Sequence, residues 1–335
     1  MRWRMWMKKF PRYCLLCSTL LELQVGSTVL LPAQVTGERP EVREPVRPRL
    51  VSYIPVGRTR YYELQEHVRV QHDLPDGTVR RWERHATYLL RFYAFTSREH
   101  DMTEISCRVE DLRYRFQQDT AVLEFESRHP EKLRRRLPDL DYVSMVVGTE
   151  AEILFSSYGD IARIGGEQLE WLREHLRTET SSGSVELAAK LAAISDARLK
   201  ALFDLHKGIV PGVRVREDSI WQRLLNLWIE GVEWRDTAHI HIAQTTDTTR
   251  ILVGVLPALS PESQTVWPPD LPQTPVVVHS GTGHAQLTVE LAPRGLISRS
   301  ELHAHTEYTG LPSGAQSPFR RITQVSMIWH FVREE

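Results

Sequence analysis

The sequence predicts a mainly β protein, a β-rich α+β fold of two similar antiparallel β-sheet halves joined by a central amphipathic helix. A strand–turn–strand unit spans Gly283 to Tyr308, with a tight turn at Ala292-Pro293-Arg294-Gly295. A similar unit runs from Ala151 to Ile164. Between them, apolar residues from Val185 to His206 recur at helical spacing, whereas residues in the two units alternate with the period of a strand.

The composition is that of a folded soluble protein. Of 335 residues, 41% are hydrophobic and 25% are charged, and the formal net charge is -1. Because a nucleic-acid-binding protein usually carries a strong basic excess, the balance of charge argues against nucleic acid as a partner.

The first 33 residues have the pattern of an export signal. Five basic residues between Arg2 and Arg12 precede an apolar stretch from Tyr13 to Leu31, and Ala33 offers a small residue for cleavage. Glu22 interrupts the apolar stretch and makes it a poor membrane span, since a central acid is costly there. We therefore expect a periplasmic, extracellular or other cell-envelope location, with no transmembrane helix in the mature chain.

The predicted domain organisation follows changes in composition along the chain. The predicted segments are a signal peptide (1–33), a flexible tether (34–58), an N-terminal antiparallel β half (59–177), a linker with the central helix (178–210) and a C-terminal antiparallel β half (211–335).

The N-terminal half begins with a predicted hairpin. Apolar and polar residues alternate from Tyr61 to Val70, Pro75-Asp76-Gly77 favours a turn, and Val79 to Phe95 forms the return strand. Further strands continue to Glu126. The later expectations are a short helix or buried strand at Leu140–Val147 and a helix at Glu167–Leu176.

The C-terminal half contains one ambiguous segment. Asp218 to Glu230 suits either a helix or a buried strand that turns at Glu230-Gly231. Strands are expected at Ala238–Gln244 and Arg250–Leu256, followed by a long proline-rich loop at Pro257–Pro275. A terminal strand is expected at Arg321–Arg333.

Several landmarks of residues 59 to 332 occur together in a recognisable order. They are Phe125-Glu126-Ser127, Val147-Gly148, Ile153 to Gly166, the central helix, Pro211 to Trp221 and Gly281 to His303. In this order the chain resembles a domain-of-unknown-function family of uncharacterised exported bacterial proteins. Glu217 stands where such proteins commonly have a glycine before Asp218-Ser219. The resemblance implies export and a β-rich fold, and it brings no catalytic residues.

Two His-x-His pairs are the best candidate for metal chemistry. His239 and His241 lie two apart on one predicted strand, and His303 and His305 on another, so each pair faces one side of its strand. Glu301 and Glu307 fall in phase with the second pair. If the two strands were neighbours, the imidazoles would suit zinc, copper or iron. A sheet with one wet face has the same pattern without any metal.

Three tryptophans, Trp221, Trp228 and Trp234, crowd the start of the C-terminal half. They fit either ordinary core packing or the wall of an apolar groove. We expect a non-enzymatic, cofactor-free envelope protein whose groove binds a lipid or another envelope protein. The alternatives are a metal-binding protein or metal-dependent enzyme that uses the histidine pairs, and an assembly module that pairs through exposed sheet edges.

Overall fold

The computed structural model describes residues 55–98, 102–130, 138–156, 160–180, 184–212, 215–216, 218–271 and 274–335. The predicted signal peptide and residues 34–54 of the predicted tether lie outside these ranges. The described residues all belong to one unit, Val46–Glu335. Among them, no helix has both the length and the apolar character that a bilayer span requires.

The described strands form a single sheet to which 13 strands contribute. The strands are β1 (Thr59–Asp73), β2 (Val79–Arg98), β3 (Met102–Gln118), β4 (Ala121–Glu126), β5 (Glu150–Ser156), β6 (Ile161–Gly165), β7 (Ile220–Ile229), β8 (Val232–Thr245), β9 (Arg250–Pro261), β10 (Thr265–Val266), β11 (Val276–Leu291), β12 (Ile297–Pro312) and β13 (Phe319–Glu334). The helices are α1 (Pro138–Ser144), α2 (Glu167–Glu179), α3 (Val185–Ala193), α4 (Asp196–Phe203) and the 3-10 turn η2 (Pro293–Gly295).

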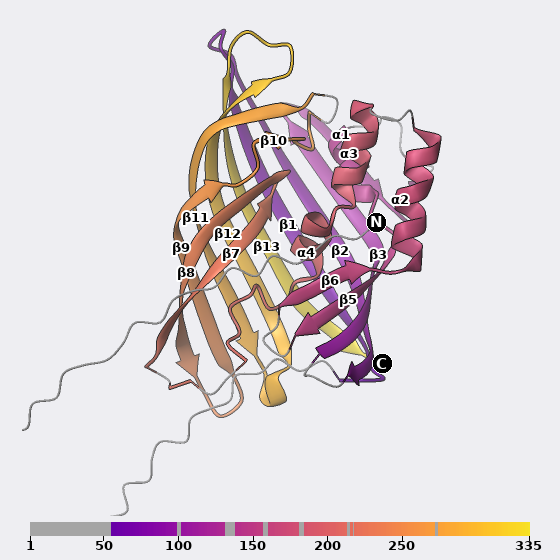
Figure 1. Cartoon of the computed structure of the whole chain (residues 1–335), viewed down its shortest axis with the longest axis vertical. Coiled ribbons are helices and arrows are strands. Elements are labelled where there is room, and N and C mark those ends of the chain that lie inside the picture. The colour runs from indigo at the N-terminus through magenta and orange to yellow at the C-terminus, as the bar shows by residue number, and fades with distance from the viewer. Residues whose placement is uncertain are drawn as a thin grey trace, which may run out of the picture. The chain divides into compact units, whose positions relative to one another are not determined.

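The order of the strands joins the two ends of the described chain in the middle of the sheet (Figure 1). The order is β6-β5-β3-β2-β1-β13-β12-β11-β9-β8-β7, with β4 beside β3 and β10 beside β11. β1 pairs antiparallel with β13, so the N-terminal and C-terminal strands form one continuous sheet. The predicted mainly β, antiparallel fold is confirmed.

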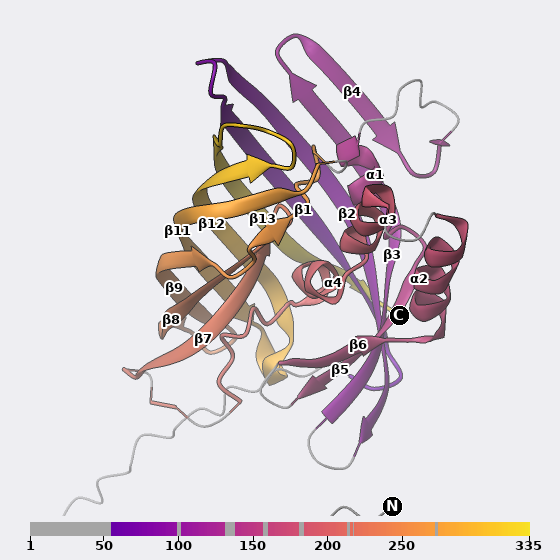
Figure 2. The same cartoon turned by 45° about the horizontal axis from the view of Figure 1, so that its top comes forward.

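The sheet is curved, and α1, α3 and α4 lie on its concave side, whereas α2 lies at the outer edge, against α3 and β5 (Figures 1 and 2). Figure 2 shows α4 within the curve, between the two ends of the sheet. α4 contacts both β6 and β7, which are the edge strands of the sheet. Within the described ranges, α1, α3 and α4 therefore cover the concave face, and no helix packs on the convex face.

Strand alternation explains which residues are buried. Along β1, Leu64, Glu66 and Val68 face the concave side and are buried, whereas Gln65 and His67 face outward. Because successive side chains of a strand point to opposite faces, a polar residue two positions from a core residue also faces the interior. Several charged residues enter the interior in this way.

Both predicted strand–turn–strand units form. They correspond to the hairpins β5–β6 and β11–β12. In the second, Arg294 and Gly295 both adopt positive φ, at 65° and 78°. Of the two alternatives for Leu140–Val147, the helix is correct in its first part, since α1 runs from Pro138 to Ser144, and Glu167–Leu176 lies within α2.

The predicted continuous helix from Val185 to His206 is wrong, because the segment forms two helices. α3 ends at Ala193 and α4 begins at Asp196. Ser195 separates them, and its side-chain oxygen accepts a hydrogen bond from the Arg198 backbone N–H, 3.3 Å away. A serine cap followed by an acidic residue is a strong helix start, and it outweighs the continuous apolar stripe.

The ambiguous segment Asp218–Glu230 is a strand, β7, and it turns through Glu230 and Gly231 with φ of 50° and 83°. The expected loop at Pro257–Pro275 is wrong in its first part, because β9 continues to Pro261. Pro257 falls where the pairing of β9 shifts register against both β8 and β11. A proline lacks the N–H that regular pairing needs, so a strand accommodates it at such irregularities.

Candidate functional site

Charged side chains fill much of the space between the sheet and its helices. We call the following set the interior cluster: Arg84, Arg198 and Arg321 with Glu66, Asp139, Glu230 and Asp270. Its members come from β1, β2, β13, α1, α4, the β7–β8 turn and the segment after β10. The cluster therefore joins parts of the chain that are distant in sequence.

Arg84 is the centre of the interior cluster and is 0% exposed. Its Nη1 lies 2.5 Å from Asp139 Oδ1, and its Nη2 lies 2.5 Å from Glu230 Oε1 and 3.4 Å from Glu66 Oε1. Tyr114 donates to the second Asp139 oxygen at 2.8 Å. One guanidinium thus holds carboxylates from β1, α1 and the β7–β8 turn.

Arg321 extends the cluster toward the segment after β10. Its Nη1 lies 2.6 Å from Asp270 Oδ1 and 2.7 Å from His72 Nε2. Trp82 donates to the other Asp270 oxygen at 3.1 Å. Burial, together with the nearby Arg321, lowers the pKa of His72 to about 4, so this imidazole is neutral at pH 7 and accepts a hydrogen bond from the guanidinium.

The cluster has one carboxylate more than it has arginines, and the pKa directions reflect this. Burial raises the pKa values of Asp139 and Glu230, despite the attraction of Arg84. Burial also acts to raise the pKa of Glu66, but Arg84 and Arg198 outweigh it and lower that pKa. Removing any one member of the cluster would leave its partner charge buried and uncompensated.

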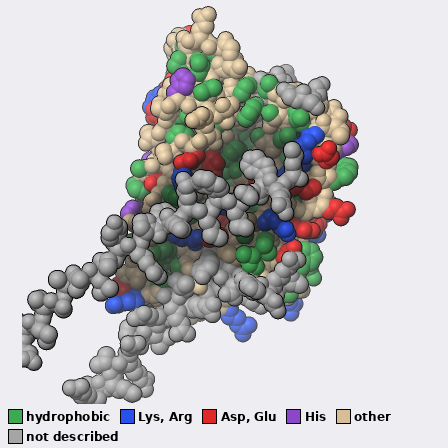
Figure 3. All heavy atoms as spheres, viewed as in Figure 1, with side chains coloured by type: hydrophobic (Ala, Val, Ile, Leu, Met, Phe, Trp, Pro, Cys, Tyr) green, Lys and Arg blue, Asp and Glu red, His purple; other side chains and the backbone are tan. Residues whose placement is uncertain are grey.

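A pocket of about 380 Å³ opens beside the cluster, between β7, α4 and the start of β6. Its apolar wall includes Leu225, Leu227, Trp228 and Leu302. This volume lies in the range of small-molecule sites. Charged and hydrophobic side chains are mixed on the part of this face that grey atoms do not cover (Figure 3).

Lys207 also lines this pocket, although it is only 6% exposed. Its Nζ lies 3.3 Å from the centroid of the Trp329 ring, a cation–π contact. Among the described residues, no carboxylate oxygen lies within 4.0 Å of this Nζ. Burial lowers the pKa of Lys207 to about 7, because desolvation disfavours the ammonium and Asp204 offsets it only in part.

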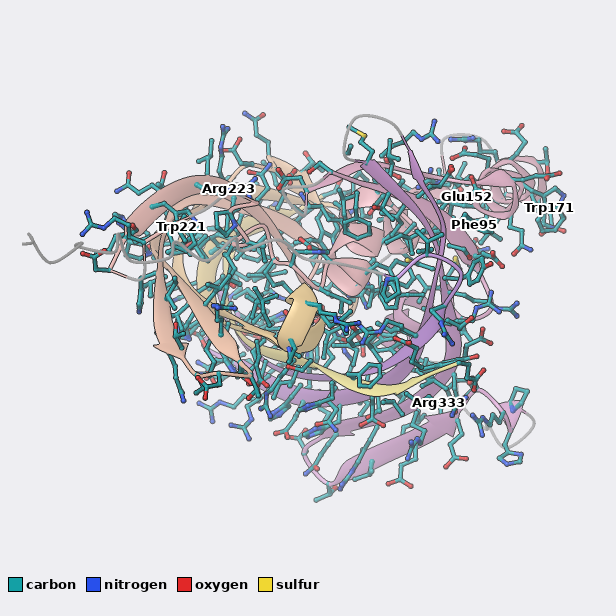
Figure 4. All side chains as sticks on the ribbon, turned by 90° about the horizontal axis from the view of Figure 1, so that it is seen from below. Phe95, Glu152, Trp171, Trp221, Arg223 and Arg333 are labelled. Carbon is teal, nitrogen blue, oxygen red and sulfur yellow. The ribbon has the colours of Figure 1, made fainter. Side chains whose placement is uncertain are left out.

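An ion pair connects the two ends of the sheet at the pocket. Arg223 of β7 donates through Nη2 to both oxygens of Asp160, at 2.7 Å and 2.5 Å. Asp160 directly precedes β6. Figure 4 shows Trp221 and Arg223 on the β7 side, with Glu152 and Trp171 on the opposite side. The pair thus bridges the gap that the open sheet leaves.

The three predicted groove tryptophans have different surroundings. Trp228 lines the pocket, and its Nε1 donates to the Tyr142 hydroxyl at 2.9 Å. Trp234 is 0% exposed within the core, and Trp221 packs against the core from β7. One of the three therefore contributes to a pocket wall.

The two His-x-His pairs do not converge. His239 and His241 lie on β8, His303 and His305 lie on β12, and β9 and β11 separate the two strands. The alternative of a shared metal site required the two strands to be neighbours, and it is wrong because the sheet order keeps the pairs apart. His305 instead stacks on His284 of β11 with ring centroids 5.4 Å apart, and His303 contacts Glu301 at 3.1 Å.

A different group has the spacing of metal ligands. His67, Glu83 and His85 place one ligand atom each within 4.8 Å of one another, on the convex face of β1 and β2. Sequence reasoning missed this group because its histidines lie on two strands. The predicted turn at Pro75–Gly77 carried the signal, since a hairpin centred on Asp76 pairs residue 67 with residue 85.

No protein-family model and no curated protein matches this chain. Among solved structures, an outer membrane channel from Pseudomonas putida F1 is 6% identical, with a TM-score of 0.22 over 86% of this chain and 100% of the other. A BenF-like porin from Pseudomonas fluorescens Pf-5 is 7% identical, with a TM-score of 0.19 over 83% and 100%. A LolA superfamily protein from Nitrosomonas europaea is 10% identical, with a TM-score of 0.14 over 79% and 84%. TM-scores this low do not establish a shared fold.

Proposed function

We propose that this chain is an exported, non-catalytic cell-envelope protein that binds an acidic amphiphile in the pocket beside β7. The observation that carries the proposal is the Lys207 ammonium, which is buried at the pocket wall without a carboxylate partner among the described residues. The basic and apolar pattern of residues 1–33 supports export.

The electrostatics of Lys207 favour an anion as the polar end of the ligand. A buried ammonium is unfavourable unless it is paired, and its lowered pKa expresses that penalty. A carboxylate or phosphate that enters the pocket would restore the missing charge partner. The Trp329 ring stabilises the cation but supplies no negative charge.

The remaining wall favours an apolar tail. Leu225, Leu227 and Trp228 of β7 form one side of the pocket, and Leu302 of β12 lies at its base. Leu224 continues the apolar surface outward and is 55% exposed. A ligand with an acidic head at Lys207 and an alkyl chain along β7 would bury the exposed part of this wall, chiefly Leu224.

A titration with palmitate at pH 7, followed by calorimetry and native mass spectrometry of the full chain, tests the proposal. We expect one palmitate per chain, and at least tenfold weaker binding of its methyl ester. Lys207→Met should weaken palmitate binding by a similar factor, since methionine keeps the apolar contact with Trp329. Lys190→Met is the matched control, because Lys190 pairs with Glu186 on α3 away from the pocket.

Raising the pH from 6 to 9 should weaken palmitate binding to the wild-type chain. The Lys207 ammonium loses its proton around pH 7 in the unliganded protein, whereas the fatty-acid carboxylate remains charged over this range. Equal binding of acid and ester, together with no effect of Lys207→Met, would contradict the proposal.

The non-catalytic part of the proposal has a separate test, because Schiff-base enzymes also use buried lysines of lowered pKa. We expect no mass increase that depends on Lys207 when the full chain and Lys207→Met are incubated with a medium-chain aldehyde and borohydride. A stoichiometric adduct that disappears in Lys207→Met would instead indicate a covalent enzyme.

A further inference from the structure

The convex face carries a second arrangement, independent of the pocket. In the β1–β2 hairpin, His67 is directly opposite His85, and Arg69 is directly opposite Glu83. Residues directly opposite on one face have Cβ atoms about 4.5–5.5 Å apart. The register therefore holds the two imidazoles opposite each other, with Glu83 two residues from His85 on the same face.

The turn between the strands fixes this register. The Leu74 N–H donates to the Thr78 carbonyl oxygen, with an N···O distance of 2.9 Å. The Gly77 N–H donates to the Leu74 carbonyl oxygen, with an N···O distance of 3.0 Å. Gly77 adopts a φ of 82°, which a glycine accepts without strain. A slip by one residue would move His67 into the core, so burial of Leu64 and Val68 keeps it outside.

The side chains already converge on one atom. His67 Nε2 lies 2.9 Å from Glu83 Oε1, and His85 Nε2 lies 2.6 Å from the same oxygen. The two rings are stacked, with centroids 4.1 Å apart and planes at 16°. Zinc ligands at about 2.1 Å in a tetrahedral arrangement are separated by about 3.4 Å, so small movements open room for an ion.

The surroundings orient the carboxylate and leave access from solvent. The second Glu83 oxygen lies 3.2 Å from Arg69 Nε. The side chains of His67, Glu83 and His85 are 31%, 34% and 50% exposed. Water can therefore complete the coordination of an ion without displacing any part of the core.

The other convex-face histidines lack this combination within the described residues. His284 and His305 stack on each other, and His303 contacts Glu301. In the described ranges, His67, Glu83 and His85 are the one set of three potential ligands whose ligand atoms all lie within 4.8 Å of one another.

We propose that His67 Nε2, His85 Nε2 and a Glu83 oxygen bind one divalent transition-metal ion of the zinc–copper class, with water in the remaining positions. Two imidazoles and one carboxylate suit these metals, whereas magnesium and calcium prefer sites made wholly of oxygen. The site lies on the opposite face of the sheet from the pocket, so it stands whether or not an amphiphile binds.

Equilibrium dialysis of the full chain against zinc sulfate, with elemental analysis, tests the site. We expect one zinc per chain, and a loss of at least tenfold in affinity in the double variant His67→Asn/His85→Asn. The matched control is His303→Asn/His305→Asn, which removes two convex-face histidines and should bind zinc as the wild type does. Zinc should also raise the thermal midpoint of the wild type but not that of the first variant.

Glu83→Gln provides a second variant that keeps the shape of the side chain and removes its charge. It should weaken zinc binding and leave the thermal midpoint without zinc close to that of the wild type. If His67→Asn/His85→Asn does not fold, Glu83→Gln alone decides the question. The proposal would be overturned if the wild type did not bind zinc, or if the control variant lost zinc binding. It would also be overturned if His67→Asn/His85→Asn or Glu83→Gln bound zinc with the affinity of the wild type.

Discussion

The two faces of the sheet place charged residues in opposite environments, even where these residues are adjacent in sequence. Arg84 and His85 are consecutive on β2. Arg84 is 0% exposed and held by three carboxylates, whereas the side chain of His85 is 50% exposed on the convex face. A buried arginine of the interior is stable only when carboxylates compensate its charge, whereas water and ions can reach the charged groups of the convex face.

This difference shows that the helices, rather than the strands, determine whether the charged residues of a face are buried in ion pairs or exposed to solvent. The same alternation runs through both faces of β1 and β2. Asp139 from α1 and Arg198 from α4 complete the pairs on the concave side. The convex face has no such cover in Figures 1 and 2, so a ligand can reach it directly.

The largest effect should come from Arg84→Met, which breaks the interior cluster. Removing one partner of a buried ionic network costs about 3–5 kcal/mol of unfolding free energy, because uncompensated carboxylates remain buried. Urea unfolding measures this loss. Arg320→Met is the matched control, since Arg320 pairs with Asp73 and Glu307 on the convex face and should leave the midpoint nearly unchanged. Equal effects of the two variants would contradict the contrast between the faces.

An intermediate effect is expected at the glycine beside the interior residue Glu230. Gly231 has a φ of 83°, and an added Cβ would lie 2.6 Å from the Trp267 carbonyl oxygen. Gly77, in the turn that sets the register of the convex site, has a φ of 82° with nothing within 4 Å. Gly77→Ala should cost about 1–2 kcal/mol from backbone strain alone, and Gly231→Ala should cost about 1–3 kcal/mol more. Thermal unfolding of both variants measures the two losses of stability. Equal losses in Gly77→Ala and Gly231→Ala would contradict this prediction.

The smallest effect is a pH dependence specific to the interior. His72 has a folded-state pKa of about 4, whereas an unfolded histidine titrates near 6.5. Below pH 6.5 the unfolded chain binds a proton that the folded chain does not, so stability falls as the pH is lowered toward 4. The slope from this residue is at most about 1.4 kcal/mol per pH unit.

His72→Asn should therefore flatten the dependence of unfolding free energy on pH between 7 and 5.5. His239→Asn, at an exposed position on the convex face of β8, is the matched control for the loss of a histidine. If the unfolding free energies of His72→Asn and the wild type depend equally on pH, the buried neutral imidazole of His72 does not contribute to the pH dependence of stability.

Much of the fold follows from local sequence. Alternation predicted the strands, and the turn residues Ala292–Gly295 and Pro75–Gly77 predicted where hairpins reverse. The break at Ser195 was also readable as a helix cap, but the apolar stripe concealed it. Pro257 was misleading, because a proline in a register shift resembles a proline in a loop.

The candidate sites were less predictable, because they depend on which strands become neighbours. The pairs at His239 and His303 look equivalent in sequence, and only the strand order shows that β9 and β11 lie between them. Lys207 carries no motif at all. Its burial against Trp329 results from pairing and packing between segments far apart in the chain.

The junction of β1 and β13 also constrains how the protein folds. Arg60 and Glu334 form an ion pair across this junction, although they are 274 residues apart in sequence. Contacts of such long range slow folding, because the entropy of loop closure is lost before they form. The central seam of the sheet therefore cannot close until β13 has been synthesised. During that interval the edge of β1 that later pairs with β13 has no partner. The growing chain can therefore aggregate through a strand that later lies in the middle of the sheet.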